Sequence, residues 1–236
     1  MFHSNEEAVA PPTGGVTIAI DGPSGAGKGT VGRGVASTLG YQYIDTGAMY
    51  RAVAFVADRR GVSFDDELGL GEIARALPIH FAPGDPPKVI IDGEDASSAI
   101  RSEKCGVGAS KVSQVQSVRQ GLVVRQRSMG ELGGVVMDGR DIGTVVFPDA
   151  EVKVFLTASV ECRISRRIQQ LENRGGHIDA EKVGRELRER DERDSTRANS
   201  PLRPAADAVV VDTSDLSIDE VTSQIVALAR AALARV

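Results

Sequence analysis

A glycine-rich stretch near the start of the chain contains the residue types that bind phosphate groups. Its pattern, GxxxxGK, is typical of loops that hold nucleoside triphosphates, although a glycine-rich turn without a ligand is the alternative. The glycines let backbone N–H groups converge on phosphate oxygens, and Lys28 can neutralise their charge. Gly29 replaces the usual Ser or Thr after this lysine, so Thr30 becomes the candidate hydroxyl for a metal ion. The stretch comprises Gly22, Pro23, Ser24, Gly25, Ala26, Gly27, Lys28, Gly29 and Thr30.

A carboxylate with metal-binding chemistry follows the apolar run at residues 134–137. An apolar strand that ends in Asp is typical of a carboxylate that holds Mg²⁺ directly or through water, so Asp138 is the first metal candidate and Thr30 the second. Gly139 permits a tight turn that places Arg140 near the phosphate-binding stretch. A turn held by an Asp–Arg pair is the alternative interpretation.

Two clusters of arginines lie in the C-terminal part of the chain. Arg163, Arg166 and Arg167 share one predicted helix, and the first and last of them lie on one face. The second cluster runs from Arg190 to Arg197 and alternates with acidic residues. Arginines on a closing lid can stabilise a phosphoryl group in transfer and exclude water. A solvated, salt-bridged helix face is the alternative.

A third polar segment follows the predicted strand at residues 41–45. Asp45 or Thr46 can cap the next helix, because Asp and Thr both favour the N-cap position. Arg51 lies about one turn into that helix. Taken alone, Arg51 has two open interpretations, a ligand contact or a surface charge.

The elements that must position these residues alternate between strands and helices. Such alternation predicts an α/β protein with a five-stranded parallel sheet flanked by helices, and ligands then lie beyond the carboxyl ends of the strands. Two strand-like runs around a Pro/Gly turn, at residues 79–82 and 88–91, predict a small antiparallel insert. The predicted strands of the main sheet are 16–21, 41–45, 134–138, 152–156 and 208–212, and the predicted helices are 31–39, 48–60, 113–129, 159–173, 180–193 and 218–234.

The composition excludes several classes of function. The 236 residues contain 28 Lys+Arg and 33 Asp+Glu, and a net charge of −5 argues against binding to a nucleic-acid polymer or an anionic membrane. Of the 28 cations 22 are Arg, a residue suited to bidentate phosphate recognition, and 14 of these lie between Arg119 and Arg203. No apolar run reaches the ~18 residues of a membrane span. Two cysteines without metal-ligand spacing favour a reducing compartment, so we expect a cytoplasmic protein. We also expect a monomer.

Five segments of the chain together resemble the bacterial cytidylate kinase family. They are IAIDGPSGAGKGT at 18–30, DTGAMYR at 45–51, DGRDIGTVVFPDA at 138–150, RERDERDSTRANSPLRPAADA at 188–208 and VDTSDLSIDEV at 211–221. The resemblance implies a P-loop kinase fold that transfers the γ-phosphoryl group of ATP to CMP or dCMP with the help of Mg²⁺. It divides the chain from residue 16 onward into a kinase core (16–71 and 111–236), an acceptor-region insert (about 72–110) and a short lid (about 160–180). The stretch before it (1–15) is acidic and lacks an apolar core, so we expect a disordered tail there.

The resemblance also implies a role for each matching residue. The stretch from Gly22 to Thr30 would hold the phosphates of ATP. The residues implied to stabilise the transferring group are Lys28, Arg140, Arg163, Arg167 and Arg190. The residues implied to bind CMP are Thr46, Arg51, Ser110, Arg119, Arg140, Asp141, Arg190, Asp194 and Arg197.

Two other functions stay open at this point. One is a different small P-loop kinase, acting on another monophosphate or a small metabolite, and the segments after Asp138 and Arg190 argue against it. The other is a regulatory switch or a nucleotide-dependent nucleic-acid protein, which the acidic balance and the absence of an NKxD sequence disfavour. A kinase of this kind needs no catalytic base, because a monophosphate oxygen is already anionic and attacks once its charge is screened.

Overall fold

The computed structural model describes residues 14–173, 175 and 178–235. Most of the tail predicted over residues 1–15 lies outside the described residues, as do residues 174, 176 and 177 of the predicted lid. Within the described part of the chain, no helix is both long enough and apolar enough to cross a lipid bilayer.

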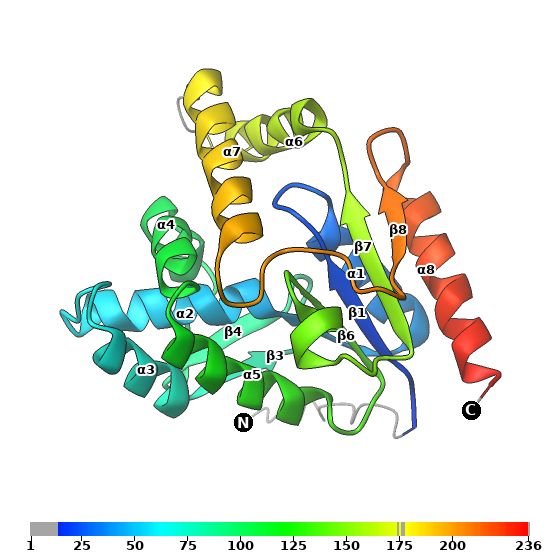
Figure 1. The fold of residues 1–236 in the computed structure, drawn as a ribbon, viewed down its shortest axis with the longest axis horizontal. Coiled ribbons are helices and arrows are strands. Elements are labelled where there is room, and N and C mark those ends of the chain that lie inside the picture. Colours follow the sequence, from blue (N-terminus) through cyan, green and yellow to red (C-terminus); the bar gives the residue numbers. More distant parts are fainter. Residues whose placement is uncertain (1–13, 174, 176–177, 236) are drawn as a thin grey trace, which may run out of the picture.

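A five-stranded parallel sheet organises the molecule, which confirms the fold class predicted from the sequence (Figure 1). Its strand order is β2-β6-β1-β7-β8, and every neighbouring pair is parallel. The carboxyl ends of all five strands therefore meet at one edge of the sheet, where ligands bind in folds of this class. The strands are β1 (Thr17–Asp21), β2 (Gln42–Asp45), β6 (Val135–Gly139), β7 (Val152–Thr157) and β8 (Val209–Asp212).

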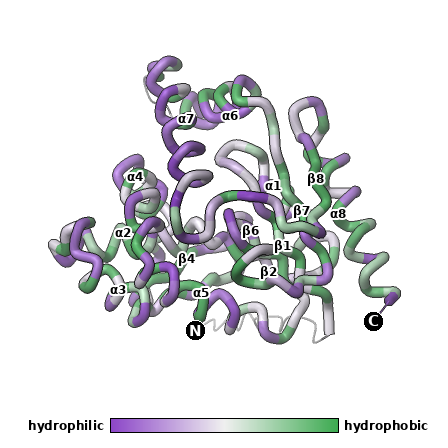
Figure 2. Tube along the Cα trace, viewed as in Figure 1, coloured by the Kyte–Doolittle hydropathy of each residue, from purple (hydrophilic) through white to green (hydrophobic). Residues whose placement is uncertain are grey.

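The middle of the central strand β1, residues 18–20, is apolar because helices cover both faces of the sheet. Ile18, Ala19 and Ile20 are all fully buried, as expected of a strand between two layers. On one face, Ile18 and Ile20 belong to a core that includes Val35 and Ile225. Figure 2 shows the corresponding green, hydrophobic stretches on the strands. The helices that supply this layer are α1 (Lys28–Leu39) and α8 (Ile218–Leu233).

The opposite face is covered partly by a turn that the sequence did not predict. Immediately after β6 the chain forms a one-turn π-helix, and its Ile142 and Val146 pack in one core with Ala19 and Met137 of the sheet. π-Helical turns are rare and concentrate at functional sites. The elements of this layer are η2 (Ile142–Val146), α5 (Gln116–Gly130) and α2 (Thr46–Arg59).

The region between α2 and α5 builds a second core beside the sheet. Its interior contains Leu70, Leu77, Ile100 and Leu122 together with apolar residues of α2. The hairpin predicted at residues 79–82 and 88–91 is present. A short third strand pairs with it, and the three strands form a separate antiparallel sheet. The sequence analysis missed two helices here, and the helix predicted over 113–129 begins at residue 116. The elements are α3 (Glu67–Ala76), β3 (Ile79–Ala82), β4 (Lys88–Ile91), β5 (Glu94–Asp95), η1 (Ala99–Arg101) and α4 (Glu103–Val112).

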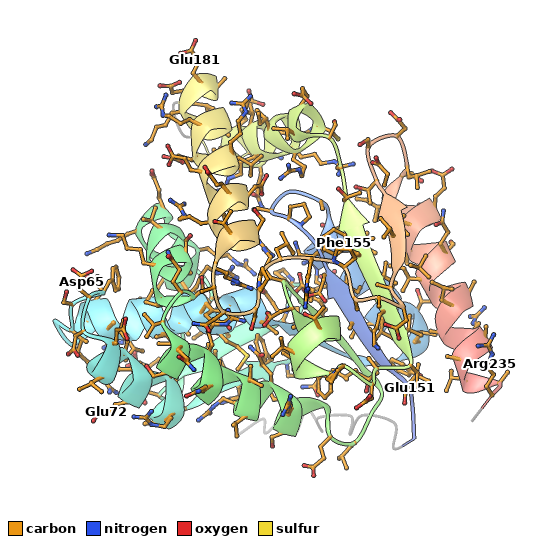
Figure 3. All side chains as sticks on the ribbon, in the orientation of Figure 1. Asp65, Glu72, Glu151, Phe155, Glu181 and Arg235 are labelled. Atoms are coloured by element: carbon orange, nitrogen blue, oxygen red, sulfur yellow. The ribbon has the colours of Figure 1, made fainter. Side chains whose placement is uncertain are left out.

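Two helices project beyond the carboxyl edge of the sheet. The chain leaves β7 into α6 (Val160–Glu172) and returns through α7 (Ala180–Thr196). In Figure 3, Glu181 at the start of α7 lies far from Phe155 in the sheet, and the helix runs back toward the centre of the molecule. The C-terminal half of α7 therefore comes to lie over the sheet edge, and Figure 2 shows most of this helix in purple, hydrophilic colours.

Candidate active site

The loop between β1 and α1 has the geometry of a phosphate cradle. Gly22, Gly25 and Gly27 have φ angles of +145°, +82° and +89°, a region that residues with side chains rarely adopt. A Cβ at Gly22 would lie only 2.0 Å from the backbone oxygen of Leu156 on β7. Both the backbone conformation and the close approach of β7 therefore require glycine at this position.

Lys28 lies at the base of this loop and is buried. Its Nζ donates a hydrogen bond of 2.8 Å to the backbone oxygen of Pro23. Burial, followed by the positive charges of Arg140 and Arg190, lowers the pKa of Lys28 to about 7, although Asp138 opposes the shift. The charged form of Lys28 is therefore destabilised in this structure, and a negatively charged ligand would stabilise it.

Asp138 lies at the carboxyl end of β6 on the same edge of the sheet. Its Oδ1 accepts a hydrogen bond of 3.0 Å from the hydroxyl of Tyr43, and its backbone oxygen accepts one of 2.7 Å from Thr46 Oγ1. Burial, together with the neighbouring charge of Asp45, raises the pKa of Asp138 to about 7. The carboxylate is therefore destabilised as an anion, and a cation placed beside it would relieve this cost.

An ion-pair network lies beside Asp138 and the loop. Asp141 pairs with buried Arg119, which also donates a 3.2 Å hydrogen bond to the backbone oxygen of Ser113. The guanidinium of Arg119 lies 5.8 Å from the centre of the Tyr50 ring, a cation–π distance. Nη2 of Arg197, from the end of α7, lies 3.8 Å from the second oxygen of Asp141.

A second pair ties α7 to the turn after β6. Nε of Arg140 donates a 2.9 Å hydrogen bond to Oδ2 of Asp194, which also lies 3.9 Å from Nε of Arg190. Although burial by itself raises the pKa of Asp194, these two arginines hold it below its usual value. Burial and the charge of Arg140 lower the pKa of Arg190 to about 10. An excess of positive charge thus remains around this carboxylate.

Several buried polar atoms at this site lack a partner. In the described part of the chain, seven buried side-chain nitrogen or oxygen atoms have no hydrogen-bond partner. Four of them belong to residues that the resemblance implies to bind CMP: Arg51 Nε, Ser110 Oγ, Arg190 Nε and Arg197 Nη2. Buried polar groups in folded proteins are nearly always hydrogen-bonded, so this concentration points to a polar ligand. Arg51 is also anchored, by a 2.8 Å ion pair with Asp45.

The predicted lid arginines differ in what they contact. Arg163 is buried and donates to the backbone oxygens of Ala158 and Ser24, and it forms a 2.6 Å ion pair with Asp191 of α7. Arg167 hydrogen bonds to Gln170 on its own helix, and its positive charge contributes to the lowered pKa of Arg190. The structure therefore places Arg163 against the phosphate loop itself. Figure 3 shows many side-chain nitrogens between α7, α5 and the sheet edge.

Thr30, the second metal candidate, is exposed on the first turn of α1.

Asp21, which the sequence analysis left without a role, is a buried member of the site. Its two carboxylate oxygens each accept a 2.8 Å hydrogen bond, from the backbone N–H groups of Ile142 and Gly143. Asp21 thereby joins the start of the phosphate loop to the turn that carries Arg140. The sequence pattern that could have identified Asp21 is the one used for Asp138, an Asp at the end of an apolar strand.

Comparison with known proteins agrees with this geometry. A family model described as cytidylate kinase matches residues 18–231. The chain is 48% identical to a cytidylate kinase of Pseudomonas putida, over 88% of this chain and 92% of that protein, and 51% identical to one of Geobacter sp., over 88% and 89%. It is also 48% identical to a bifunctional pantoate ligase/cytidylate kinase of Synechococcus sp., over 96% of this chain but only 44% of that longer protein.

Among solved structures, an uncharacterized protein from Eubacterium ventriosum matches with a TM-score of 0.51 and 12% identity, over 92% of this chain and 98% of that chain. A likeness at this identity concerns the fold alone. The family match covers most of the chain, and it includes both the phosphate loop and the residues of α7. The chain therefore belongs to the cytidylate kinase family, a family of nucleoside monophosphate kinases.

Proposed function

We propose that this chain transfers the γ-phosphoryl group of ATP to CMP or dCMP, giving ADP and the cytidine diphosphate. The observation that carries the proposal is the set of four buried polar atoms on Arg51, Ser110, Arg190 and Arg197 that have no hydrogen-bond partner, although those of Arg190 and Arg197 lie at ion-pair distance from Asp194 and Asp141. They come from three elements that are distant in the sequence: Arg51 from α2, Ser110 from α4, and Arg190 and Arg197 from α7 and its C-terminal end. A nucleoside monophosphate supplies the phosphate, sugar and base oxygens that such donors need.

The donor nucleotide occupies the loop from Gly22 to Thr30 in this proposal. Backbone N–H groups there and the start of α1 would bind the phosphate oxygens. Lys28 would carry its full positive charge once the phosphates of ATP surround it, because anions raise the pKa of a lysine. Its charge would then offset the charge that develops on the transferring group.

The acceptor occupies the ion-pair network. In this proposal Arg51, Arg119 and Arg140 hold the phosphate of CMP, and Thr46 borders it. The remaining residues contact the nucleoside: Ser110, Asp141 and Arg197 the cytosine ring, and Arg190 and Asp194 the sugar. Support comes from the existing pairs, since Asp141 and Asp194 already hold Arg119 and Arg140 in fixed positions. Preorganised arginines need little rearrangement when the acceptor arrives.

Transfer itself needs positioning and charge screening more than proton removal. The acceptor phosphate oxygen is anionic, so it attacks in line once its repulsion with ATP is reduced. Lys28, Arg140 and Arg190 lie close enough for their charges to alter one another's pKa values, which supports a shared role in this screening. Arg163 and Arg167 complete the proposed set from α6.

The residues present fit Mg²⁺ bound mainly by nucleotide phosphates. Within the described ranges, no group of three or more His, Cys, Asp or Glu side chains is placed to hold a metal ion. Mg²⁺ usually keeps several waters and takes one or two carboxylates plus substrate phosphates. Asp138, with its raised pKa, is the carboxylate that would hold it, directly or through water, and the exposed hydroxyl of Thr30 is the second candidate. Bound there, Mg²⁺ would neutralise charge on the phosphates of ATP.

A panel of acceptors tests the proposed function. ADP release from ATP is measured with CMP, dCMP, UMP, AMP, GMP or shikimate, and with no acceptor. We expect turnover well above the no-acceptor rate with CMP and dCMP. If neither gives such turnover, the proposal is wrong, and turnover with a different member of the panel would identify another small P-loop kinase.

A further inference from the structure

Arg166 is the one member of the first arginine cluster to which the proposed transfer gives no role. Its Nη1 lies 3.0 Å from Thr213 Oγ1 and 3.4 Å from the backbone oxygen of Gly25, and its Nη2 lies 2.6 Å from the backbone oxygen of Thr213. Thr213 directly follows β8 and is 3% exposed. The guanidinium therefore bridges β8 and the phosphate loop from the side of α6.

Thr213 itself reaches the next residue of the loop. Its Oγ1 lies 3.2 Å from the backbone oxygen of Ala26 and 3.1 Å from that of Thr157, and its N–H donates a 2.8 Å hydrogen bond to Thr157. A hydroxyl has one hydrogen to donate and can accept at the same time. Thr213 Oγ1 can thus accept from Arg166 while its one hydrogen is shared between the Ala26 oxygen of the loop and the Thr157 oxygen of β7.

These contacts belong to a consistent pattern along the loop. The backbone oxygens of Ser24, Gly25 and Ala26 each meet a side-chain donor, respectively from Arg163, Arg166 and Thr213. In a trans peptide, the C=O and the following N–H point in opposite directions. Carbonyls held from the side of α6 and β8 therefore turn the following N–H groups away from that side; of these, the N–H of Ala26 lies 3.5 Å from the backbone oxygen of Pro23 in the same loop.

We propose that Arg166 and Thr213 are positioning residues of the donor site. They hold the carbonyls of Gly25 and Ala26 outward, so that the loop presents its N–H groups to phosphate before the nucleotide binds. Gly25 and Gly27 give the loop unusual conformational freedom, and without these contacts binding would have to order it. This inference deepens the proposed function, because it rests on ATP occupying the loop.

Substitution of Thr213 separates the hydroxyl from the shape of the side chain. Thr213→Val replaces the hydroxyl by a methyl group of similar size, and Thr213→Ser keeps the hydroxyl. We expect Thr213→Val to raise the Kd for ADP, measured by calorimetry, about three- to tenfold, the effect of losing one hydrogen bond. The Kd for CMP should not change, and Thr213→Ser should restore ADP binding to within about twofold of the unaltered chain.

Thr222→Val is the matched control, because it makes the same change on α8 at a buried hydroxyl with no partner among the described residues. It should leave both dissociation constants unchanged. Arg166→Met is the second variant and should weaken ADP binding in the same way, and the double variant should lose less than the sum of the two, since the side chains act through one contact.

Amide hydrogen exchange gives a readout that does not depend on turnover. In the nucleotide-free protein, Thr213→Val and Arg166→Met should speed exchange at residues 24–27 and leave the sheet unchanged. The inference is overturned if the valine and methionine variants bind ADP normally, if they weaken CMP binding equally, or if Thr213→Ser behaves like Thr213→Val. Suppose that neither CMP nor dCMP gives turnover in the acceptor panel, but that Thr213→Val and Arg166→Met weaken ADP binding as expected. The proposed function would then be rejected, and this inference would stand.

Discussion

Lys28 is the residue of the phosphate loop whose pKa the surrounding charges and burial shift. Burial and the neighbouring Arg140 and Arg190 lower its pKa, while Asp138 partly compensates. A nucleotide brings several negative charges to the same place, and these favour the charged ammonium. The free protein and the nucleotide complex should therefore differ in the number of protons that they bind.

This difference predicts proton uptake when nucleotide binds. At pH 7.5 the amine of Lys28, with a pKa of about 7, is mostly neutral in the free protein, and bound phosphates raise that pKa. We expect the binding enthalpy of metal-free ADP to depend on the ionisation enthalpy of the buffer, with the sign of proton uptake. Calorimetry in HEPES and in Tris measures it. Lys28→Met should reduce the uptake, and an unchanged uptake would contradict the assignment to Lys28.

The same residue should dominate turnover. We expect Lys28→Met to lower kcat with CMP by about a hundredfold or more, because in the proposed mechanism the lost charge faces the transferring group in the transition state. Steady-state ADP release measures the effect. Arg33→Met is a control on the same helix, since Arg33 is partly exposed and pairs with Asp85 instead. Normal turnover in the Lys28 variant would remove this lysine from the mechanism.

At the scale of elements, α7 matters because its ion pairs join it to the turn after β6. Asp194, on its last turns, holds Arg140 from the turn after β6 and lies near Arg190 on its own helix. One carboxylate thus fixes the relative position of two elements that are far apart in the sequence. Loss of its charge would release both arginines from their present positions.

The contacts of Asp194 with Arg140 and Arg190 predict that loss of its charge weakens the binding of CMP more than that of ATP. Asp194→Asn should raise the KM for CMP about tenfold or more, the effect of losing a hydrogen bond to a charged group, and should change the KM for ATP much less. Initial rates with either substrate varied measure the two constants. Glu192→Gln, an exposed position of the same helix, should leave both unchanged. Equal effects of Asp194→Asn on both substrates would place Asp194 outside the acceptor site.

At the scale of the whole molecule, Asp21 ties the central strand to the opposite layer. It stays ionisable in a buried place because two backbone N–H groups, of Ile142 and Gly143, bind its carboxylate. Burial nevertheless dominates and raises the pKa of Asp21 to about 6, from an ordinary value of 3.8. The folded state therefore binds more protons than the unfolded state between about pH 4 and pH 6.

The consequence is a pH dependence of stability with a definite sign. Since the folded chain holds the extra proton, the contribution of Asp21 to stability falls as pH rises from 4 to 6, by about 3 kcal/mol at most. Asp21→Asn cannot lose that proton. We expect the Tm of Asp21→Asn minus the Tm of the unaltered chain to become more positive across this range. Thermal denaturation at pH 4.5, 5.5 and 6.5 measures it, and a constant difference would contradict the raised pKa.

Much of this protein could be predicted from local signals in the chain. The glycine-rich stretch, the apolar β-branched strands and the helices around them are encoded over a few neighbouring residues, so the parallel sheet and its functional edge followed from pattern alone. The same holds for the β3–β4 hairpin, which has a Pro/Gly turn between two short runs. Helix α4 was missed because Gly106 and Gly108 weaken its helical signal, and its stability comes from packing on α2.

What the chain determines by itself is therefore the phosphate loop, the order of elements and the supply of arginines. Only the tertiary structure decided which arginine meets which carboxylate, because Arg119 and Asp141, or Arg163 and Asp191, are brought together by elements distant in sequence. It also decided the contacts of Asp21 and Thr213, whose partners come from other elements at the sheet edge. Ion pairs and loop contacts depend on distances of a few ångströms, and no periodicity in a sequence specifies those.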